Sequence, residues 1–252
     1  MLKFAADLDT QFGGLPFLDR FEAAAAAGYR GAECRSPYAW PVEQIAHRLC
    51  LYGLELVQHA LPLTVPGAAS GTSATAAAAQ RARRAELEQA VRYARALGVR
   101  QLSCPLPDGP DGVAQLAGTA ALLRQHGLTL VAALRSAGGC GAAFAQIAAL
   151  RSGGAENLYL QYRIDASTSV DDAAALLAGR LPLIRHVRLR DAAAPAAEPW
   201  LALLERLGYQ GWVSCGAAHR DPHHAAYPAP HPPPYPPAPR PAAQVAAADS
   251  LI

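Results

Sequence analysis

The sequence predicts an α/β fold in which eight strands alternate with helices and close into a (β/α)₈ barrel. The first indication is a rhythm: alanine-rich helical stretches end at a glycine, and a short β-prone run follows, at Gly28, Gly53, Gly98, Gly127 and Gly208. Glycine stops a helix in the left-handed conformation without a Cβ penalty. The second indication is length, because 252 residues are typical of one such barrel.

The expected strands form two groups. Five follow the glycines, at 29–33, 54–58, 99–103, 128–132 and 209–213, and three lack a preceding glycine, at Lys3–Asp7, Leu158–Ile164 and Ile184–Leu189. Strands that alternate with helices indicate a parallel sheet. An open doubly wound sheet is the alternative. No GxGxxG opens a helix and no GxxxxGK[ST] occurs, so a nucleotide site is not indicated and the barrel is favoured.

Two intervening helices each show one apolar face, with apolar residues at spacings of three and four. The first face is formed by Val42, Ile45, Leu49 and Tyr52, and the second by Leu87, Val91, Ala94 and Leu97. A run of charges between Arg81 and Glu88 precedes the second face. We interpret this run as a solvated surface and not as a binding patch.

Composition excludes several classes of protein. Hydrophobic residues make up 52% and charged residues 17%, which is typical of a globular domain. The formal net charge of +2 does not indicate a nucleic-acid or anionic-lipid surface. We find no uncharged apolar stretch of membrane-spanning length and no signal peptide, so we expect a cytoplasmic protein. The five scattered cysteines form no CxxC and are expected to be reduced and mostly buried.

The chain divides into a barrel domain, residues 1–226, and a Pro/Ala-rich tail, residues 227–252. Prolines dominate from 227 to 241 and exclude a helix there, because proline removes a donor and clashes with the preceding turn. We expect an extended or disordered arm, with a docking motif as the alternative, so the final barrel helix is absent or degenerate. For the cluster of His219, Asp221, His223 and His224, adventitious zinc or nickel binding is favoured over a functional site.

Several segments resemble the hydroxypyruvate isomerase family. They are GLPFLDRF at 14–21, Pro37-Tyr38, EQAVRYARALG at 88–98, NLYLQY at 157–162, His186-Val187, and GYQGWV at 208–213 with Cys215. The resemblance implies a xylose isomerase-like TIM barrel and an aldose–ketose type isomerisation of hydroxypyruvate to tartronate semialdehyde. It also implies a divalent cation, Mg²⁺ or Mn²⁺, and carboxylate bases at the C-terminal ends of the strands.

The positions that match the family's metal site carry other residues. They are Ala132 and Gly216 where the family has glutamates, Arg163 where it has an aspartate, and Arg188 where it has a glutamine. Alanine and glycine offer no ligand atom, and arginine stays protonated and repels a cation. We therefore expect no metal, no cofactor and no intact catalytic residue, and hence impaired isomerase activity.

The resemblance to the family implies that Arg163 and Arg188 point into the barrel mouth, and alternation along the strand puts Asp165 on the same side as Arg163. There the guanidinium groups either pair with Glu33 or Asp165 in a structural network, which is favoured, or bind an anion such as a small hydroxy or oxo acid. His59, near the end of another strand, is a further candidate, with a structural role favoured.

Three hypotheses about function remain open. The chain is a catalytically silent relative of the isomerases retained for binding, an active isomerase that uses relocated residues, or a decayed product. The sequence does not indicate an oligomeric state.

Overall fold

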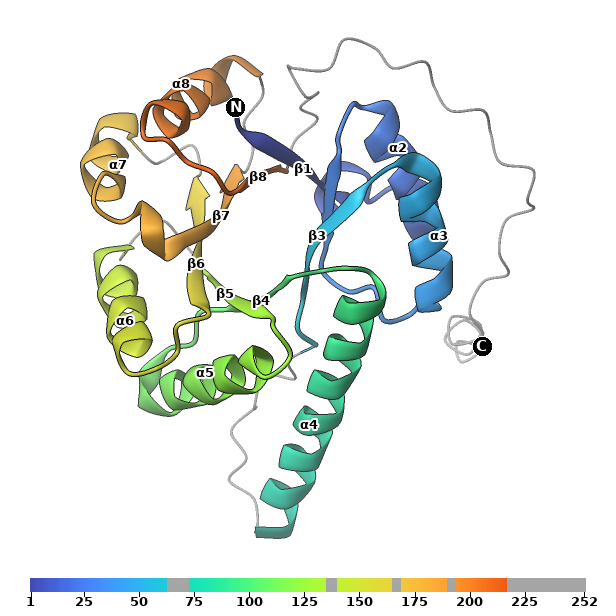
Figure 1. The fold of residues 1–252 in the computed structure, drawn as a ribbon, viewed down its shortest axis with the longest axis vertical. Helices are drawn as coiled ribbons and strands as arrows, with labels where there is room; N and C mark the ends of the chain where they lie inside the picture. Colours follow the sequence, from blue (N-terminus) through green and yellow to red (C-terminus); the bar gives the residue numbers. More distant parts are fainter. Residues whose placement is uncertain (63–72, 135–139, 165–168, 190–193, 217–252) are drawn as a thin grey trace, which may run out of the picture.

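Eight parallel strands pair in sequence order until β8 closes on β1, which confirms the predicted barrel (Figure 1). The computed structural model describes residues 1–62, 73–134, 140–164, 169–189 and 194–216. The strands are β1 Lys3–Asp7, β2 Gly31–Cys34, β3 Glu55–Ala60, β4 Gln101–Pro105, β5 Thr129–Ala133, β6 Leu158–Ile164, β7 Ile184–Leu189 and β8 Trp212–Cys215.

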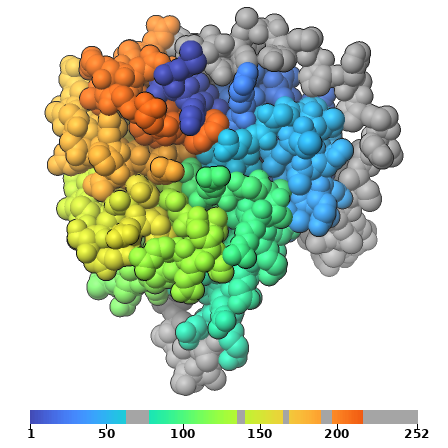
Figure 2. Space-filling view, viewed as in Figure 1, coloured from blue at the N-terminus to red at the C-terminus, as the bar shows by residue number. Residues whose placement is uncertain are grey.

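Helices surround the strands, and α4 extends beyond the end of the barrel (Figure 1). They are α1 Leu8–Gln11, α2 Arg20–Ala26, α3 Val42–Tyr52, α4 Ser73–Ala96, α5 Gly109–Arg124, α6 Cys140–Ser152, α7 Val170–Leu177 and α8 Ala194–Arg206, with short 3₁₀ turns η1 Phe17–Asp19 and η2 Leu181–Leu183. On the face seen in Figure 2, side chains fill the centre of the barrel, as in a packed core.

Five strands begin one to three residues later than the sequence predicts, because the residue after each helix-ending glycine still belongs to the helix cap. Leu54, for example, donates its backbone N–H to the Leu49 carbonyl at 2.9 Å, while Gly53 has a φ of 63°. This is the bond pattern of a Schellman motif. Tyr29, Val99, Leu128 and Tyr209 make the equivalent bond. These β-prone residues are buried as caps, and the ladder starts only after them.

The two predicted apolar helix faces pack on the barrel. Ile45, Leu49 and Tyr52 of α3 are buried, as are Val91 and Ala94 of α4. The charged run of α4 is exposed or half-buried, as expected for a solvated surface. All five cysteines are free and four are buried, the exception being Cys50.

Within the described ranges, no helix is long and apolar enough to cross a membrane. The chain after Gly216 lies outside the described residues. The predictions of an extended tail, a missing final helix and adventitious metal binding at His219 to His224 therefore stay predictions.

Candidate functional site

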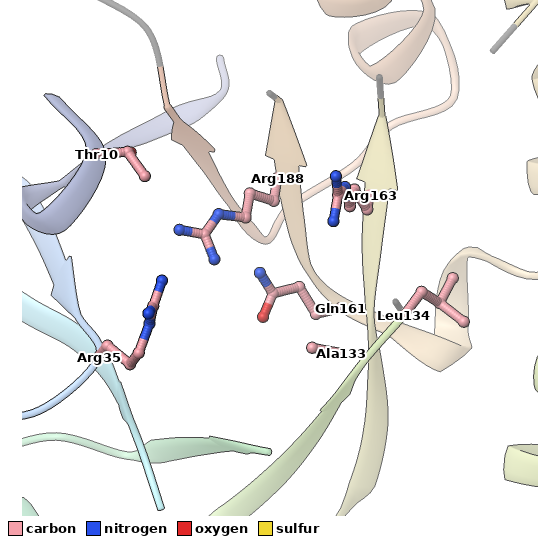
Figure 3. Close-up of a pocket in the computed structure, with 7 residues that line it drawn as sticks. All are labelled: Thr10, Arg35, Ala133, Leu134, Gln161, Arg163 and Arg188. Carbon is pink, nitrogen blue, oxygen red and sulfur yellow. The ribbon is translucent and has the colours of Figure 1, made fainter. Parts of the chain in front are cut away.

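A pocket of about 190 Å³ opens at the C-terminal ends of the strands, where barrel proteins carry their sites. Its walls come from the turn after β1, the ends of β2 and β5, and the strands β6 and β7 (Figure 3). The lining residues are Thr10, Arg35, Ala133, Leu134, Gln161, Arg163 and Arg188. Three of the seven lining residues are arginines.

Arg188 reaches across the mouth to two buried carboxylates. Its Nη2 contacts Oδ2 of Asp7 and lies 3.6 Å from Oε1 of Glu33. Asp7 and Glu33 are Cα partners on adjacent strands, and they are only 1% and 3% exposed. The guanidinium charge therefore offsets the cost of burying these two acids. The sequence predicted the pairing with Glu33 but missed Asp7.

Beneath Arg188, polar side chains from several strands form one hydrogen-bonded layer inside the barrel. Oε2 of Glu33 lies 2.6 Å from Nε2 of Gln58, which donates to it, and 2.9 Å from Nε2 of His186. Nε2 of Gln101 lies 3.3 Å from both Oε1 of Gln58 and Nδ1 of His186. This pattern assigns the His186 proton to Nε2, from which it is donated to Glu33. The layer holds the Glu33 carboxylate in a fixed orientation.

Ser214 completes this layer but does not form a catalytic triad with His186 and Glu33. Its Oγ lies 3.0 Å from Nε2 of His186, the same nitrogen that contacts Glu33. A triad needs the acid and the nucleophile on opposite ring nitrogens. Ser214 and His186 are also both 0% exposed, so no substrate reaches them.

The residues present do not fit a divalent cation. No group of three or more His, Cys, Asp or Glu side chains that could hold a metal occurs within the described parts of the chain. Arg163 and Arg188 are Cα partners on adjacent strands and both line the pocket. Ala132 is fully buried in β5 and lies outside the pocket lining, to which its neighbour Ala133 belongs; neither alanine, nor Gly216 after β8, brings a side-chain ligand atom. Mg²⁺ and Mn²⁺ require several oxygen ligands, and two guanidinium groups repel either ion.

His59 lies outside the pocket lining. It alternates with Gln58 along β3, so Gln58 points into the barrel and His59 points toward Tyr38. Nδ1 of His59 is 2.9 Å from the Tyr38 hydroxyl, which donates to the Ala60 carbonyl, while Nε2 has no hydrogen-bond partner among the described residues. Burial lowers the pKa of His59 to about 4, against a smaller opposing effect of the Ala60 carbonyl. Asp165 lies outside the described residues.

Sequence reasoning missed Arg35, which lines the pocket directly after β2. Its backbone N–H donates to Oδ2 of Asp9 at 2.6 Å, and Asp9 is paired with Arg20 at 3.0 Å. A signal was present, because Arg35 follows Glu33 by two positions and lies just past the C-terminal end of its strand. The same reasoning would have found Asp7, the last residue of β1.

Comparison with known proteins identifies relatives for this chain. It is 38% identical over 112 residues to hydroxypyruvate isomerase of Escherichia coli, a match that covers 44% of this chain and 43% of that protein. It is 37% identical over 114 residues to 2-oxo-tetronate isomerase of Haemophilus influenzae, with 43% of each chain covered. The predicted resemblance to hydroxypyruvate isomerases is confirmed. The match spans less than half the length of these relatives, and no protein-family model matches the chain.

Solved structures extend the likeness to the whole barrel. The crystal structure of AP endonuclease, family 2, from Brucella melitensis has a TM-score of 0.69 and 25% identity, covering 88% of this chain and 95% of that one. A xylose isomerase-like TIM barrel protein from Mycobacterium smegmatis, in complex with magnesium, has a TM-score of 0.56 and 12% identity, covering 85% and 89%. The second likeness concerns the fold alone, and it confirms the xylose isomerase-like architecture.

Proposed function

We propose that this barrel binds a small 2-oxo or 2-hydroxy acid at its mouth and has lost the metal-dependent isomerase chemistry that its resemblance implies. One observation carries the proposal: Arg188, at a position where the family has a metal ligand, makes its ion pairs with Asp7 and Glu33. The guanidinium group at this position thus carries a positive charge where the resemblance implies a metal ligand, and that charge is paired with two buried acids. The names of the relatives, which act on hydroxypyruvate and 2-oxo-tetronate, support a small acid as the ligand.

The pocket suits such a ligand in size and in chemistry. Its volume of about 190 Å³ is below the roughly 300–1,000 Å³ of sites for drug-sized molecules. Guanidinium groups bind carboxylates through two parallel N–H···O bonds. The Gln161 amide and the Thr10 hydroxyl, which also line the pocket, can bond an adjacent oxo or hydroxyl group.

Isomerisation would in addition need a base beside each reacting carbon and a group that stabilises the enediolate. Asp7 and Glu33 are the described carboxylates that pair with the pocket-lining Arg188, and Glu33 is in addition engaged by Gln58 and His186. Neither Asp7 nor Glu33 lines the pocket, so neither is placed beside a reacting carbon of a ligand there. Loss of a positioned base costs on the order of 10²–10⁴ in rate.

The test is an initial-rate assay with hydroxypyruvate, with and without Mg²⁺ or Mn²⁺, paired with calorimetric titration of glycerate as a stable ligand. Cooperative thermal unfolding of the same sample establishes that the protein is folded. We expect glycerate to bind and no turnover above the buffer rate in any metal condition. Metal-dependent turnover would instead support an active isomerase with relocated residues, and a folded protein that binds no acid would contradict the binding role.

A further inference from the structure

The three pocket arginines differ in what holds their side chains. Arg188 is committed to Asp7 and Glu33. The Arg35 guanidinium makes no ion pair or hydrogen bond with any described residue. The residue is instead held by its backbone N–H, which donates to Asp9. Arg35 is therefore a pocket arginine whose guanidinium donors remain available to a ligand.

Arg35 also lies where a ligand would bridge the mouth. It follows β2, whereas Arg163 belongs to β6, four strands away around the closed barrel of eight. Figure 3 shows the two side chains on opposite sides of the pocket, with the Arg188 guanidinium between them. A carboxylate beside Arg35 thus lies over the pocket floor, within the field of the other two charges.

The turn that follows β1 places Arg35. Asp9 accepts the Arg35 backbone N–H at 2.6 Å and pairs with Arg20, whose guanidinium also donates to the carbonyls of Leu15 and Gly13. The carboxylate of Asp9 is thereby neutralised and tied to its own loop. It fixes the Arg35 backbone without an uncompensated negative charge beside the pocket. Thr10, the next residue, lines the pocket itself.

We propose that Arg35 binds the carboxylate of the acid, and that Asp9 is its positioning residue, acting through the Arg35 backbone. This inference rests on the proposed acid-binding function and deepens it, because it assigns the ligand's charged group to the β2 side of the mouth. That side lies across the pocket from Arg163, with the Arg188 guanidinium between them (Figure 3).

The first test is titration of glycerate into the wild type, Arg35→Gln and Arg35→Lys, with glycerol as the uncharged ligand control. Charge-assisted hydrogen bonds of this kind account for roughly a 10- to 100-fold difference in affinity, which is the loss expected for Arg35→Gln. Arg35→Lys keeps the charge without the bidentate fork and should lie in between. The matched control is Arg81→Gln on the exposed surface of α4, which should bind glycerate as the wild type does.

The second test is a double-mutant cycle with Asp9→Asn. If Asp9 acts through Arg35, then Asp9→Asn weakens glycerate binding severalfold in the wild type and has no further effect in Arg35→Gln. A general structural role would give additive losses, and that result would overturn the role assigned to Asp9. Thermal unfolding shows whether each variant is folded.

The outcomes separate this inference from the function on which it rests. A wild type that binds no glycerate contradicts the proposed function. A wild type that binds glycerate with the same affinity as Arg35→Gln leaves that function standing and overturns the assignment of Arg35.

Discussion

Two sides of the barrel mouth contribute opposite partners to its buried ion pairs. The β1–β2 side brings the carboxylates of Asp7 and Glu33, both buried, whereas the β6–β7 side brings the guanidinium groups of Arg163 and Arg188. In the family that the chain resembles, the second side supplies metal ligands. Here Arg188 from the second side pairs with the acids on the first, and in our proposal these ion pairs stand in place of the metal site that the resemblance implies.

The largest loss of stability should come from replacing Arg188, whose ion pairs join the two sides of the mouth. Arg188→Gln leaves Asp7 and Glu33 buried without their countercharge. Breaking a buried pair costs roughly 3–5 kcal/mol, and we expect the lower end, about 3 kcal/mol, because the Arg188 side chain is 27% exposed. Urea unfolding at neutral pH measures the loss.

The control for this variant is Asp7→Asn/Arg188→Gln, which removes one charge from each side. Its free energy of unfolding should recover much of the loss. If Arg188→Gln alone is as stable as the wild type, the ion pairs of Arg188 with Asp7 and Glu33 contribute nothing to stability. That result would contradict our account of the two sides of the mouth.

A smaller effect on stability should separate two buried histidines: His186, inside the barrel, and His59, on the side of β3 that faces Tyr38. His186 contacts Gln101, Ser214 and Glu33, whereas Nε2 of His59 has no hydrogen-bond partner among the described residues. The pKa of His59 is lowered from 6.5 to about 4 by burial. Below pH 6.5 the unfolded chain binds a proton that the folded chain refuses until about pH 4, so stability falls as the pH falls through this window.

The expected loss from His59 is roughly 2 kcal/mol by pH 5 relative to pH 8. Urea unfolding at several pH values measures it, with His59→Gln as the matched variant, since glutamine does not titrate. The free energy of unfolding should fall less steeply between pH 6.5 and 5 in the variant than in the wild type. Equal slopes in both proteins would show that His59 does not titrate differently in the folded and unfolded states.

The fold was largely predictable because its signals are local. Helix-ending glycines marked five of the eight strands. The predicted starts of these strands are one to three residues too early for one reason: residues such as Leu54 cap the preceding helix before the strand begins. Gly154 ends the helix before β6 in the same way: it has a positive φ, and the backbone N–H of Ala155 donates to the Leu150 carbonyl. Sequence reasoning overlooked this glycine.

The site was predictable only in part, because its pairs join residues far apart in the chain. Strand alternation and the family resemblance placed Arg163 and Arg188 at the mouth, where the structure has them lining the pocket. The pairing of Arg188 with Asp7 depends on the closure of β8 on β1, which leaves only β8 between β7 and β1, and no local pattern encodes that. The position of Arg35 depends on its bond to Asp9, a contact between the segment after β2 and the short helix α1.

The most direct test of the central claim is whether the mouth holds a divalent cation. Thermal unfolding of metal-free protein with added millimolar Mg²⁺ or Mn²⁺ measures this, since a ligand that binds only the folded state raises the midpoint. These two ions prefer oxygen ligands, so the histidines at His219 to His224 do not interfere. We expect the midpoint to stay unchanged, because arginine supplies the charge at the mouth. A rise of several degrees that disappears in Glu33→Gln would contradict the account and restore a metal site to this barrel.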